Sequence, residues 1–257
     1  MTSKPYPNAE PDASFGRGFA MLRAKVARRL AQGPYARRVS IGLRRDLSVA
    51  VDPPTAKIPV SLRPFNEGDF PALFPAGCDA SARGERTDVE WRLRAAAYGM
   101  LPSRCFVAID GRSSRPCHIQ WLTEPGYGDA IRQAGALPIL AAEEAMLENA
   151  FTPVEYRGLG IMSVAVHLIA ERAAALGKRY LVAYVDADNR ASLKGVERAG
   201  FTPWSIRTRR QFGFGLLRTV RFDRIAGGAL PDVHSVPGGV GAGSGGPKGS
   251  SPIEDDH

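Results

Sequence analysis

The stretch VEYRGLGIMSV, residues 154–164, combines an arginine and two glycines with the start of an apolar, helix-like segment. Glycines let the backbone turn tightly, so that consecutive N–H groups can point into one concavity. The N-terminus of a following helix adds partial positive charge at the same place. These residues could therefore hold a phosphate group. The plainer interpretation is that Gly158 and Gly160 only separate two elements.

Three kinds of phosphate-binding loop could contain this stretch. A nucleoside triphosphate loop needs Lys and then Ser or Thr after its last glycine, and no lysine follows Gly160. A dinucleotide loop needs a third glycine, and Ser163 stands at that place. A pyrophosphate held by the backbone amides of RGLGIM fits the spacing better.

The motifs downstream of the turn carry more information than the turn itself. PVEYRGLGI (153–161) is followed by a helix-like stretch, a strand-like stretch, DNRAS (188–192) and ERAGF (197–201). In this order and at this spacing, the motifs resemble the GNAT superfamily of acyl-CoA N-acyltransferases. The resemblance covers about residues 58–225. It implies an α/β fold in which helices flank a mixed, mostly antiparallel twisted sheet.

The resemblance also implies a function. It predicts transfer of an acyl group, with acetyl the expected one, from acyl-CoA to an amine by direct attack in a ternary complex. Acetyl-CoA or another acyl-CoA would be the co-substrate, and no metal is expected. The acceptor could be an amine-bearing small molecule, a peptide or a protein. The alternative is a catalytically weak module that binds acyl-CoA or regulates through it.

Three segments make up the coenzyme A site that the resemblance implies. The turn would hold the pyrophosphate through backbone N–H groups, and the strand before it would pair with the pantetheine arm. The implied residues are Asn149, Ala150 and Phe151 on the strand, Arg157, Gly158, Leu159, Gly160, Ile161 and Met162 in the turn, and Asn189 and Ser192 farther along. Asn189 and Ser192 could instead only cap a helix.

Two positions depart from the family pattern. Met162 stands where Gly or Ala is usual, although its backbone N–H is retained. Val196 stands where many members carry the tyrosine that protonates the departing thiolate. Tyr184 and Tyr156 are candidate replacements for that acid, and solvent is the alternative proton source.

Two carboxylates, Glu144 and Glu148, precede the turn. Attack on a thioester needs a neutral amine, so a base near the acceptor would help. If residues 143–152 form a strand, both side chains share one face, and Glu144 lies near the place where some family members carry a base. A backbone N–H near Phe151 would meet the oxyanion. Both glutamates could instead be ordinary surface residues.

The elements that must position these residues follow from the apolar pattern. Residues 141–152 have a helical composition, yet the resemblance implies a strand over 143–152. Residues 126–140 fit a loop or a helix. The pattern predicts strands over 58–65, within 103–123, over 178–186 and on both sides of QFGFG (211–215), and helices from 66, over 86–99, over 161–177 and over 187–200.

The positive charge is concentrated at the N-terminus. Residues 1–45 contain ten basic and two acidic residues, and the rest of the chain contains 24 of each. Residues 1–57 are therefore expected to form a basic extension, with an amphipathic helix over about 15–32 and an extended segment or short strand over 36–51. The helix could pack on the domain over 58–225, or residues 15–45 could contact an anionic surface weakly. Sequence-specific nucleic-acid binding is not expected, because no such motif is present.

Residues 226–257 are rich in Gly, Ser and Pro, and predict a disordered tail. Three cysteines are too few for a disulfide framework, and their spacing matches no zinc motif. No apolar run approaches about 18 residues, and the polar N-terminus does not resemble a secretory signal. A cytoplasmic protein is expected, with its oligomeric state left open.

Overall fold

The computed structural model describes residues 33–77, 80–100, 102–127, 137–214 and 216–225. Within them, eight strands form one sheet in the order β2-β3-β4-β5-β6-β1-β7-β8. The strands are β1 Tyr35–Asp46, β2 Val60–Pro64, β3 Ser103–Asp110, β4 Pro116–Thr123, β5 Glu144–Phe151, β6 Tyr180–Asp186, β7 Thr202–Phe212 and β8 Leu217–Arg224. Only the β5–β6 pair is parallel among these neighbours. The expected α/β fold with a mostly antiparallel sheet is confirmed, whereas the helix expected over 15–32 and the tail over 226–257 lie outside the described residues.

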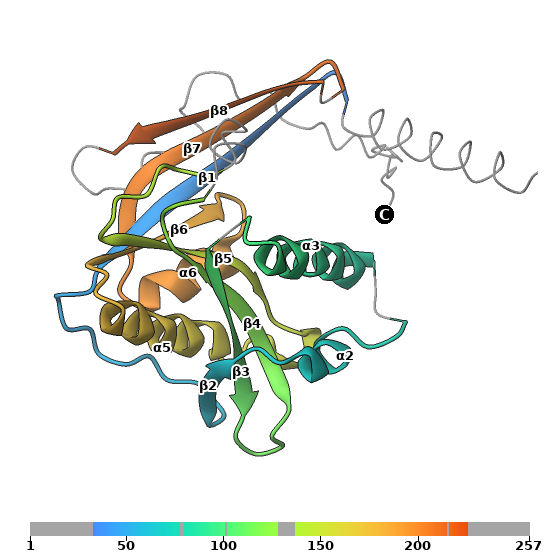
Figure 1. The fold of residues 1–257 in the computed structure, drawn as a ribbon, viewed down its shortest axis with the longest axis vertical. Helices are drawn as coiled ribbons and strands as arrows, with labels where there is room; N and C mark the ends of the chain where they lie inside the picture. Colours follow the sequence, from blue (N-terminus) through green and yellow to red (C-terminus); the bar gives the residue numbers. More distant parts are fainter. Residues whose placement is uncertain (1–32, 78–79, 101, 128–136, 215, 226–257) are drawn as a thin grey trace, which may run out of the picture.

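Helices cover both faces of this sheet (Figure 1). They are α2 Phe70–Leu73, α3 Ala80–Ala97, α5 Ile161–Ala175 and α6 Arg190–Arg198, with short 3-10 helices η1 Glu67–Asp69 and η2 Val154–Tyr156. α5 and α6 pack on the face that carries Leu43, Leu147 and Ala183. α2 and α3 pack on the opposite face, against Trp121 and Phe151. The central strands of the sheet are therefore buried between two helical layers, whereas β8 at the edge is largely exposed.

The parallel strands β5 and β6 separate part-way along their length. Their register begins with Glu144 opposite Tyr180 and ends with Leu147 opposite Ala183. β4 stays paired with β5 as far as Phe151. Within the described residues, the edge of β5 that faces β6 therefore has no strand partner from Glu148 onward.

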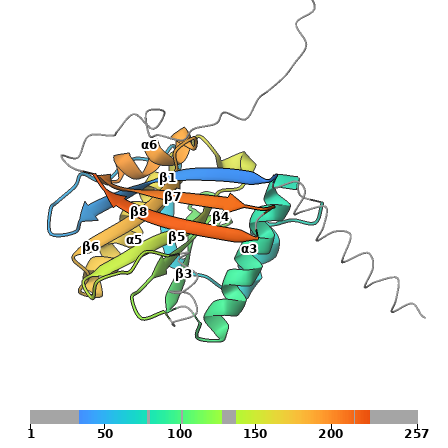
Figure 2. The same cartoon turned by 90° about the horizontal axis from the view of Figure 1, so that it is seen from above.

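The N-terminal strand β1 lies inside the sheet and not beside it. It pairs with β6 on one side and with β7 on the other, and Figure 2 shows it running along β7 and β8. Its apolar residues Ile41 and Leu43 are buried. The sequence indicated only an extended segment or short strand here, within an extension that reached residue 57. The sheet thus takes in part of the segment that we expected outside the 58–225 domain, because β1 fills the place between β6 and β7.

Most other predicted elements occur where the pattern placed them. The strand over 143–152 is confirmed as β5, and the helices over 161–177 and 187–200 are confirmed as α5 and α6. The helix expected over 86–99 is α3, which begins earlier, at Ala80. Asn189 caps α6, since its side-chain oxygen accepts a hydrogen bond from the Ser192 N–H at 3.1 Å. Most of the ambiguous 126–140 segment lies in the undescribed stretch 128–136.

Candidate functional site

Gly160 determines the shape of the turn before α5. Its φ of +80° is left-handed, and an added Cβ would lie 2.8 Å from the carbonyl oxygen of Thr55. The connector that carries Thr55 is held against the turn, because the Lys57 N–H donates to the Leu159 carbonyl at 2.8 Å. Gly158 has φ +73°, but a Cβ there would meet nothing within 4 Å. The first N–H groups of α5 have no partner within the helix, so the turn presents them to an anion.

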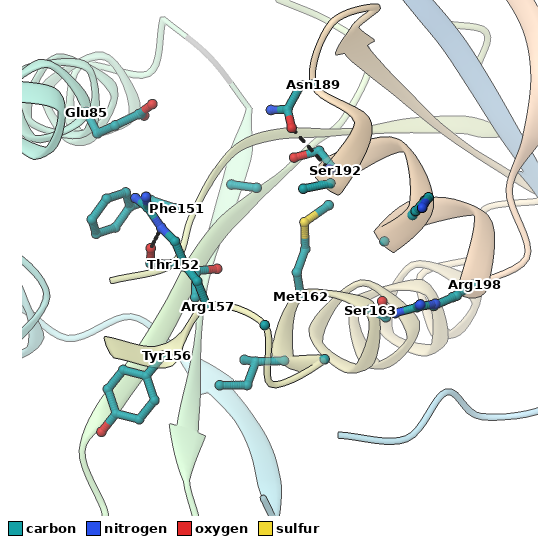
Figure 3. A pocket seen from close by; sticks show the side chains of 17 residues that line it. Glu85, Phe151, Thr152, Tyr156, Arg157, Met162, Ser163, Asn189, Ser192 and Arg198 are labelled. Atoms are coloured by element: carbon teal, nitrogen blue, oxygen red, sulfur yellow. Dashed lines mark hydrogen bonds between the residues drawn. The ribbon is translucent and has the colours of Figure 1, made fainter. Parts of the chain in front are cut away.

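A cavity of about 510 Å³ lies between this turn, the end of β5 and α6 (Figure 3). It brings three separate segments of the chain together. The predicted coenzyme A residues that line it are Ala150, Phe151, Arg157, Gly158, Gly160, Ile161, Met162, Asn189 and Ser192. Leu159 does not line the cavity; it packs behind the turn in an apolar cluster with Ile58 and Tyr156.

A β-bulge at Asn149 shapes the strand beside the cavity. Asn149 has φ +48°. Glu148 pairs with Trp121 and Phe151 pairs with Ile119, so β5 advances three residues while β4 advances two. The bulge therefore turns Glu148 and Phe151 toward the same face of the sheet. Asn149 itself is outside the cavity lining, and its predicted contact with coenzyme A stays a prediction.

Positive side chains outnumber negative ones around the cavity. Arg157, Lys194 and Arg198 line it together with one carboxylate, that of Glu85 on α3. Burial raises the pKa of Glu85, the neighbouring Asp88 raises it further, and Arg157 lowers it. The balance of charge favours a ligand that carries phosphate groups.

Several lining residues were not singled out from the sequence as cofactor contacts. They are Glu85, Thr152, Tyr156, Ser163, Ala191, Lys194, Gly195 and Arg198. The four on α6, Ala191, Lys194, Gly195 and Arg198, share one helical face, because the last three follow Ala191 by three, four and seven positions. Glu85 gave no such signal, because α3 reaches the cavity from a distant part of the chain. Thr152 is fixed by His118, whose Nδ1 lies 2.8 Å from the threonine hydroxyl. Burial lowers the pKa of His118 to about 4, so this histidine is neutral near pH 7.

The family is decided by comparison with known proteins. Residues 60–202 match the family model described as the acetyltransferase (GNAT) domain. The chain belongs to the GNAT acetyltransferase family. The resemblance inferred from the turn, DNRAS and ERAGF is therefore confirmed. The match begins at β2 and ends at the first residue of β7, so β1 and β8 of this GNAT protein lie outside it.

Solved structures of other GNAT proteins are similar to this chain at low identity. One is a GCN5-related N-acetyltransferase from Sphaerobacter thermophilus, at 16% identity and TM-score 0.46, covering 74% of this chain and 56% of that one. Another is a GNAT-family acetyltransferase from Colwellia psychrerythraea, at 15% identity and TM-score 0.43, covering 74% of this chain and 57% of that one. A third is the ribosomal-protein-S5-alanine acetyltransferase from Vibrio fischeri, at 13% and 0.35, covering 55% and 78%. This chain thus spans little more than half the length of the first two. A search of curated proteins found no match.

The described residues contain neither a membrane-spanning helix nor a metal-binding cluster. None of the helices in this part of the GNAT protein is long and apolar enough to cross a membrane. No group of three or more His, Cys, Asp or Glu side chains is arranged there to hold a metal ion.

Glu148 lies beside the bulge and is held by two partners. Its Oε2 accepts hydrogen bonds from the Arg92 guanidinium and from the Thr123 hydroxyl, the latter at 2.6 Å. The side chains of Arg92 and Glu148 are 3% and 11% exposed, so this ion pair joins α3 to β5 in the interior. Glu148 is therefore not the surface glutamate that the sequence left open.

Glu144 is also buried, but it lies elsewhere on the same face. It pairs with Tyr180 at the closed end of the β5–β6 pair, and its Oε2 accepts from the Ala141 N–H at 3.0 Å. Glu148 lies four positions further along the strand, which corresponds to about 13 Å. The catalytic role of either glutamate stays a prediction, and of the two only Glu148 adjoins the separated strands.

The two candidate acids and the usual acid position of the family lie in three different places. Tyr184 is the first residue of β6 beyond its pairing with β5, and it lies on the face that carries Glu148. Its hydroxyl is 3.1 Å from Ser205 Oγ. Burial raises the pKa of Tyr184. Tyr156 lines the cavity at the turn. Val196 is packed in the core with α5 residues, so the usual acid position is apolar in this GNAT domain.

Met162 occupies space in the cavity that a smaller residue would leave free. Figure 3 shows its side chain reaching from α5 toward Ser192. Its Sδ and Cε lie 3.3 Å from the position of a Cβ on Gly195. Met162→Ala should lower the Kd for coenzyme A by about 3- to 10-fold, since the backbone N–H remains while the cavity widens. It should also lower the free energy of unfolding by about 1–2 kcal/mol, because the half-buried methionine loses packing.

Calorimetric titration with coenzyme A measures this effect, and Met162→Leu, which keeps the volume, serves as the control. Weaker binding by Met162→Ala would mean that the thioether supports the ligand and does not obstruct it.

Proposed function

We propose that the protein transfers an acyl group, with acetyl the expected one, from acyl-CoA to an amine in a direct ternary complex. The observation that carries this proposal is the separation of β5 from β6 beside a cavity headed by the Gly160 turn. An extended thioester arm can pair with the free edge of β5 through main-chain hydrogen bonds. Its pyrophosphate can meet the N–H groups at the start of α5, with Arg157, Lys194 and Arg198 nearby.

The amine would be activated at Glu148. As the nitrogen attacks the thioester carbonyl, the C–N bond forms and the ammonium proton passes to the Glu148 carboxylate, directly or through one water. Arg92 and Thr123 hold this carboxylate in position beside the bulge. A backbone N–H of β5 at the bulge, near Phe151, would stabilise the oxyanion.

The departing sulfur would take its proton from Tyr184. The C–S bond breaks, the phenol donates its proton to the thiolate, and solvent returns a proton from Glu148 to Tyr184. Support for this role is that burial raises the pKa of Tyr184, so the phenol is protonated at neutral pH, and that Ser205 orients the hydroxyl.

The proposal predicts that acetyl-CoA binds and that amines release its thiol. At 1 mM acetyl-CoA the melting temperature of the full chain should rise by several degrees, because a ligand at 100 times its Kd adds about 2.7 kcal/mol to stability. A thiol-release assay across small amines, amino acids and peptides should then find turnover.

Two outcomes would contradict the proposal. If millimolar acetyl-CoA leaves the melting temperature unchanged, the proposed cofactor site is refuted. A clear shift without turnover for any amine would leave a protein that binds acyl-CoA without transferring the acyl group.

A further inference from the structure

The face of the sheet that carries Glu148 and Tyr184 continues across β1 and β7. Ser40 on β1 lies opposite Asp186 on β6 and opposite Arg207 on β7, and Arg38 lies opposite Arg209. Directly paired residues share a face, and so do residues two apart along a strand. Arg38, Arg207 and Arg209 therefore gather on one face around Asp186; we call these three arginines the arginine cluster.

The arginine cluster has more positive charge than its neighbours balance. The carboxylate of Asp186 is 3.5 Å from Arg209, 3.8 Å from Arg38, and accepts a hydrogen bond from the Ser40 hydroxyl at 2.6 Å. Arg207 donates to the same hydroxyl at 3.1 Å. One carboxylate thus serves three guanidinium groups. No other acidic side chain is recorded in an ion pair with them within the described residues.

Partial burial makes this excess charge unfavourable. Burial, together with the neighbouring Arg209, lowers the pKa of Arg207 to about 10, although Asp186, Tyr184 and Glu148 act in the opposite direction. The buried Nε atoms of Arg207 and Arg209 have no hydrogen-bond partner in the part of the chain that is described. An anion bound beside Arg38 and Arg209, whose side chains are 73% and 37% exposed, would relieve this repulsion.

The arginine cluster adjoins the proposed reaction centre. The Arg207 guanidinium stands over the Tyr184 ring, 5.0 Å from its centroid. Gly42 of β1 leaves room for the Tyr184 side chain to extend over β1 toward Ser205. A Cβ at Gly42 would lie 2.7 Å from the Tyr184 ring and would also overlap Ser205. The Arg207 guanidinium also donates to Ser40, so it lies above β1, which is two strands from β5. Adjacent strands are about 4.8 Å apart, so the guanidinium is on the order of 10 Å from a group bound at β5.

We propose that the arginine cluster binds an anionic group of the acceptor, so that the preferred substrate is an amine that also carries a carboxylate or a phosphate several bonds from its nitrogen. This inference rests on the proposed function, because it assigns the acceptor class of the same site. Arginine presents paired N–H donors that match both carboxylate and phosphate oxygens. The anion would anchor the acceptor while its amine reaches Glu148.

Matched acceptors that differ in charge test the inference. Thiol release from acetyl-CoA is measured with 5-aminopentanoate against 5-aminopentanamide, and with phosphoethanolamine against ethanolamine. In the parent chain, kcat/KM should be at least tenfold higher for the anionic member of at least one pair, mainly through a lower KM. The pair that shows the difference tells whether carboxylate or phosphate is preferred.

The variants Arg209→Gln and Arg38→Gln/Arg209→Gln should bring this ratio toward one, whereas Arg207→Lys, which keeps the charge, should retain part of it. Arg221→Gln is the matched control. Arg221 of β8 lies opposite Thr208 of β7, on the face of the sheet away from the arginine cluster, and pairs with Asp223 at 2.7 Å. Its replacement should therefore leave the ratio unchanged. Equal use of anionic and neutral acceptors by the parent, or a preference that survives Arg38→Gln/Arg209→Gln, would overturn the inference.

A binding measurement separates this inference from the proposed function. With coenzyme A at saturation, the anionic compounds should raise the melting temperature of the parent more than the neutral ones, and Arg38→Gln/Arg209→Gln should remove the difference. That result without turnover would keep the anion site and refute the acyl transfer. Turnover without any preference for anionic acceptors, in rates or in melting temperature, would keep the acyl transfer and refute the anion site.

Discussion

Replacing Glu148 with glutamine should lower kcat by on the order of 10²–10⁴, the usual effect of removing a general base. Glutamine cannot take the proton from the attacking amine, so the loss should appear in kcat for every acceptor. Glu144→Gln is the matched control on the same strand and face. Because Glu144 lies at the closed end of the β5–β6 pair, its replacement should leave kcat within a few-fold of the parent.

The Glu148 variant carries a structural side effect that must be separated from catalysis. It leaves the buried Arg92 without its ionic partner, and breaking one side of a buried ion pair typically costs about 3–5 kcal/mol of stability. Arg92→Met should cost a similar amount for the same reason. The double variant Arg92→Met/Glu148→Gln removes both charges and should recover most of the stability.

The double variant therefore decides between the two roles of Glu148. A folded but inactive double variant, by denaturant unfolding and thiol release, supports the base. If the double variant turns over acetyl-CoA as fast as the parent does, Glu148 serves the structure alone.

Replacing Gly160 with alanine should raise the Kd for coenzyme A by at least about 10-fold, equivalent to about 1.4 kcal/mol. The left-handed φ disfavours any side chain, and the added Cβ would press on the Thr55 carbonyl at 2.8 Å. A backbone oxygen held by the neighbouring Lys57–Leu159 hydrogen bond cannot simply rotate away. The turn itself must shift, and with it the direction of the first N–H groups of α5. The free energy of unfolding should fall by about 1–3 kcal/mol.

Gly158→Ala is the natural control for this experiment. It has a similar φ, yet a Cβ there meets nothing within 4 Å. Only the conformational cost of about 1–2 kcal/mol should remain, and coenzyme A should still raise the melting temperature. Calorimetric titration and thermal unfolding measure both variants. Equal affinities for Gly160→Ala and the parent would contradict the anion-binding role of the turn.

The sequence predicted the site best where neighbouring residues build it. The turn and the α6 cap depend on contacts within a few residues, such as Asn189 with Ser192, and both occur as expected. The strand over β5 was predicted against its own composition. Ala, Glu, Met and Leu favour helix in isolation, but pairing with β4 and β6 decides the outcome. Only the family resemblance carried that information.

The features that were not predicted depend on contacts between distant residues. The partner of Glu148 is Arg92, 56 positions away, and Glu85 reaches the cavity from the same helix. In the sequence pattern, Arg92 and Glu85 look like ordinary charged residues on the exposed face of a helix. The place of β1 was missed for the same reason. β1 contains five arginine and aspartate residues, at positions 37, 38, 44, 45 and 46. These charges obscure, in the sequence pattern, the apolar core residues Ile41 and Leu43.

The position of β1 bears on how the chain folds. Its residues pair with β6 and β7, whose partner residues lie 134 to 177 positions later in the sequence, from Asp46 with Tyr180 to Tyr35 with Phe212. Contacts of such high separation form slowly, because a long loop must close before they are made. On a ribosome, the strand synthesised first must therefore wait, unpaired, until nearly the whole domain has emerged. During that interval both edges of β1 would stay unpaired, and an open strand edge is the kind of surface that attracts wrong partners. The basic residues along β1 then have a second use, since charge on a waiting strand discourages self-association.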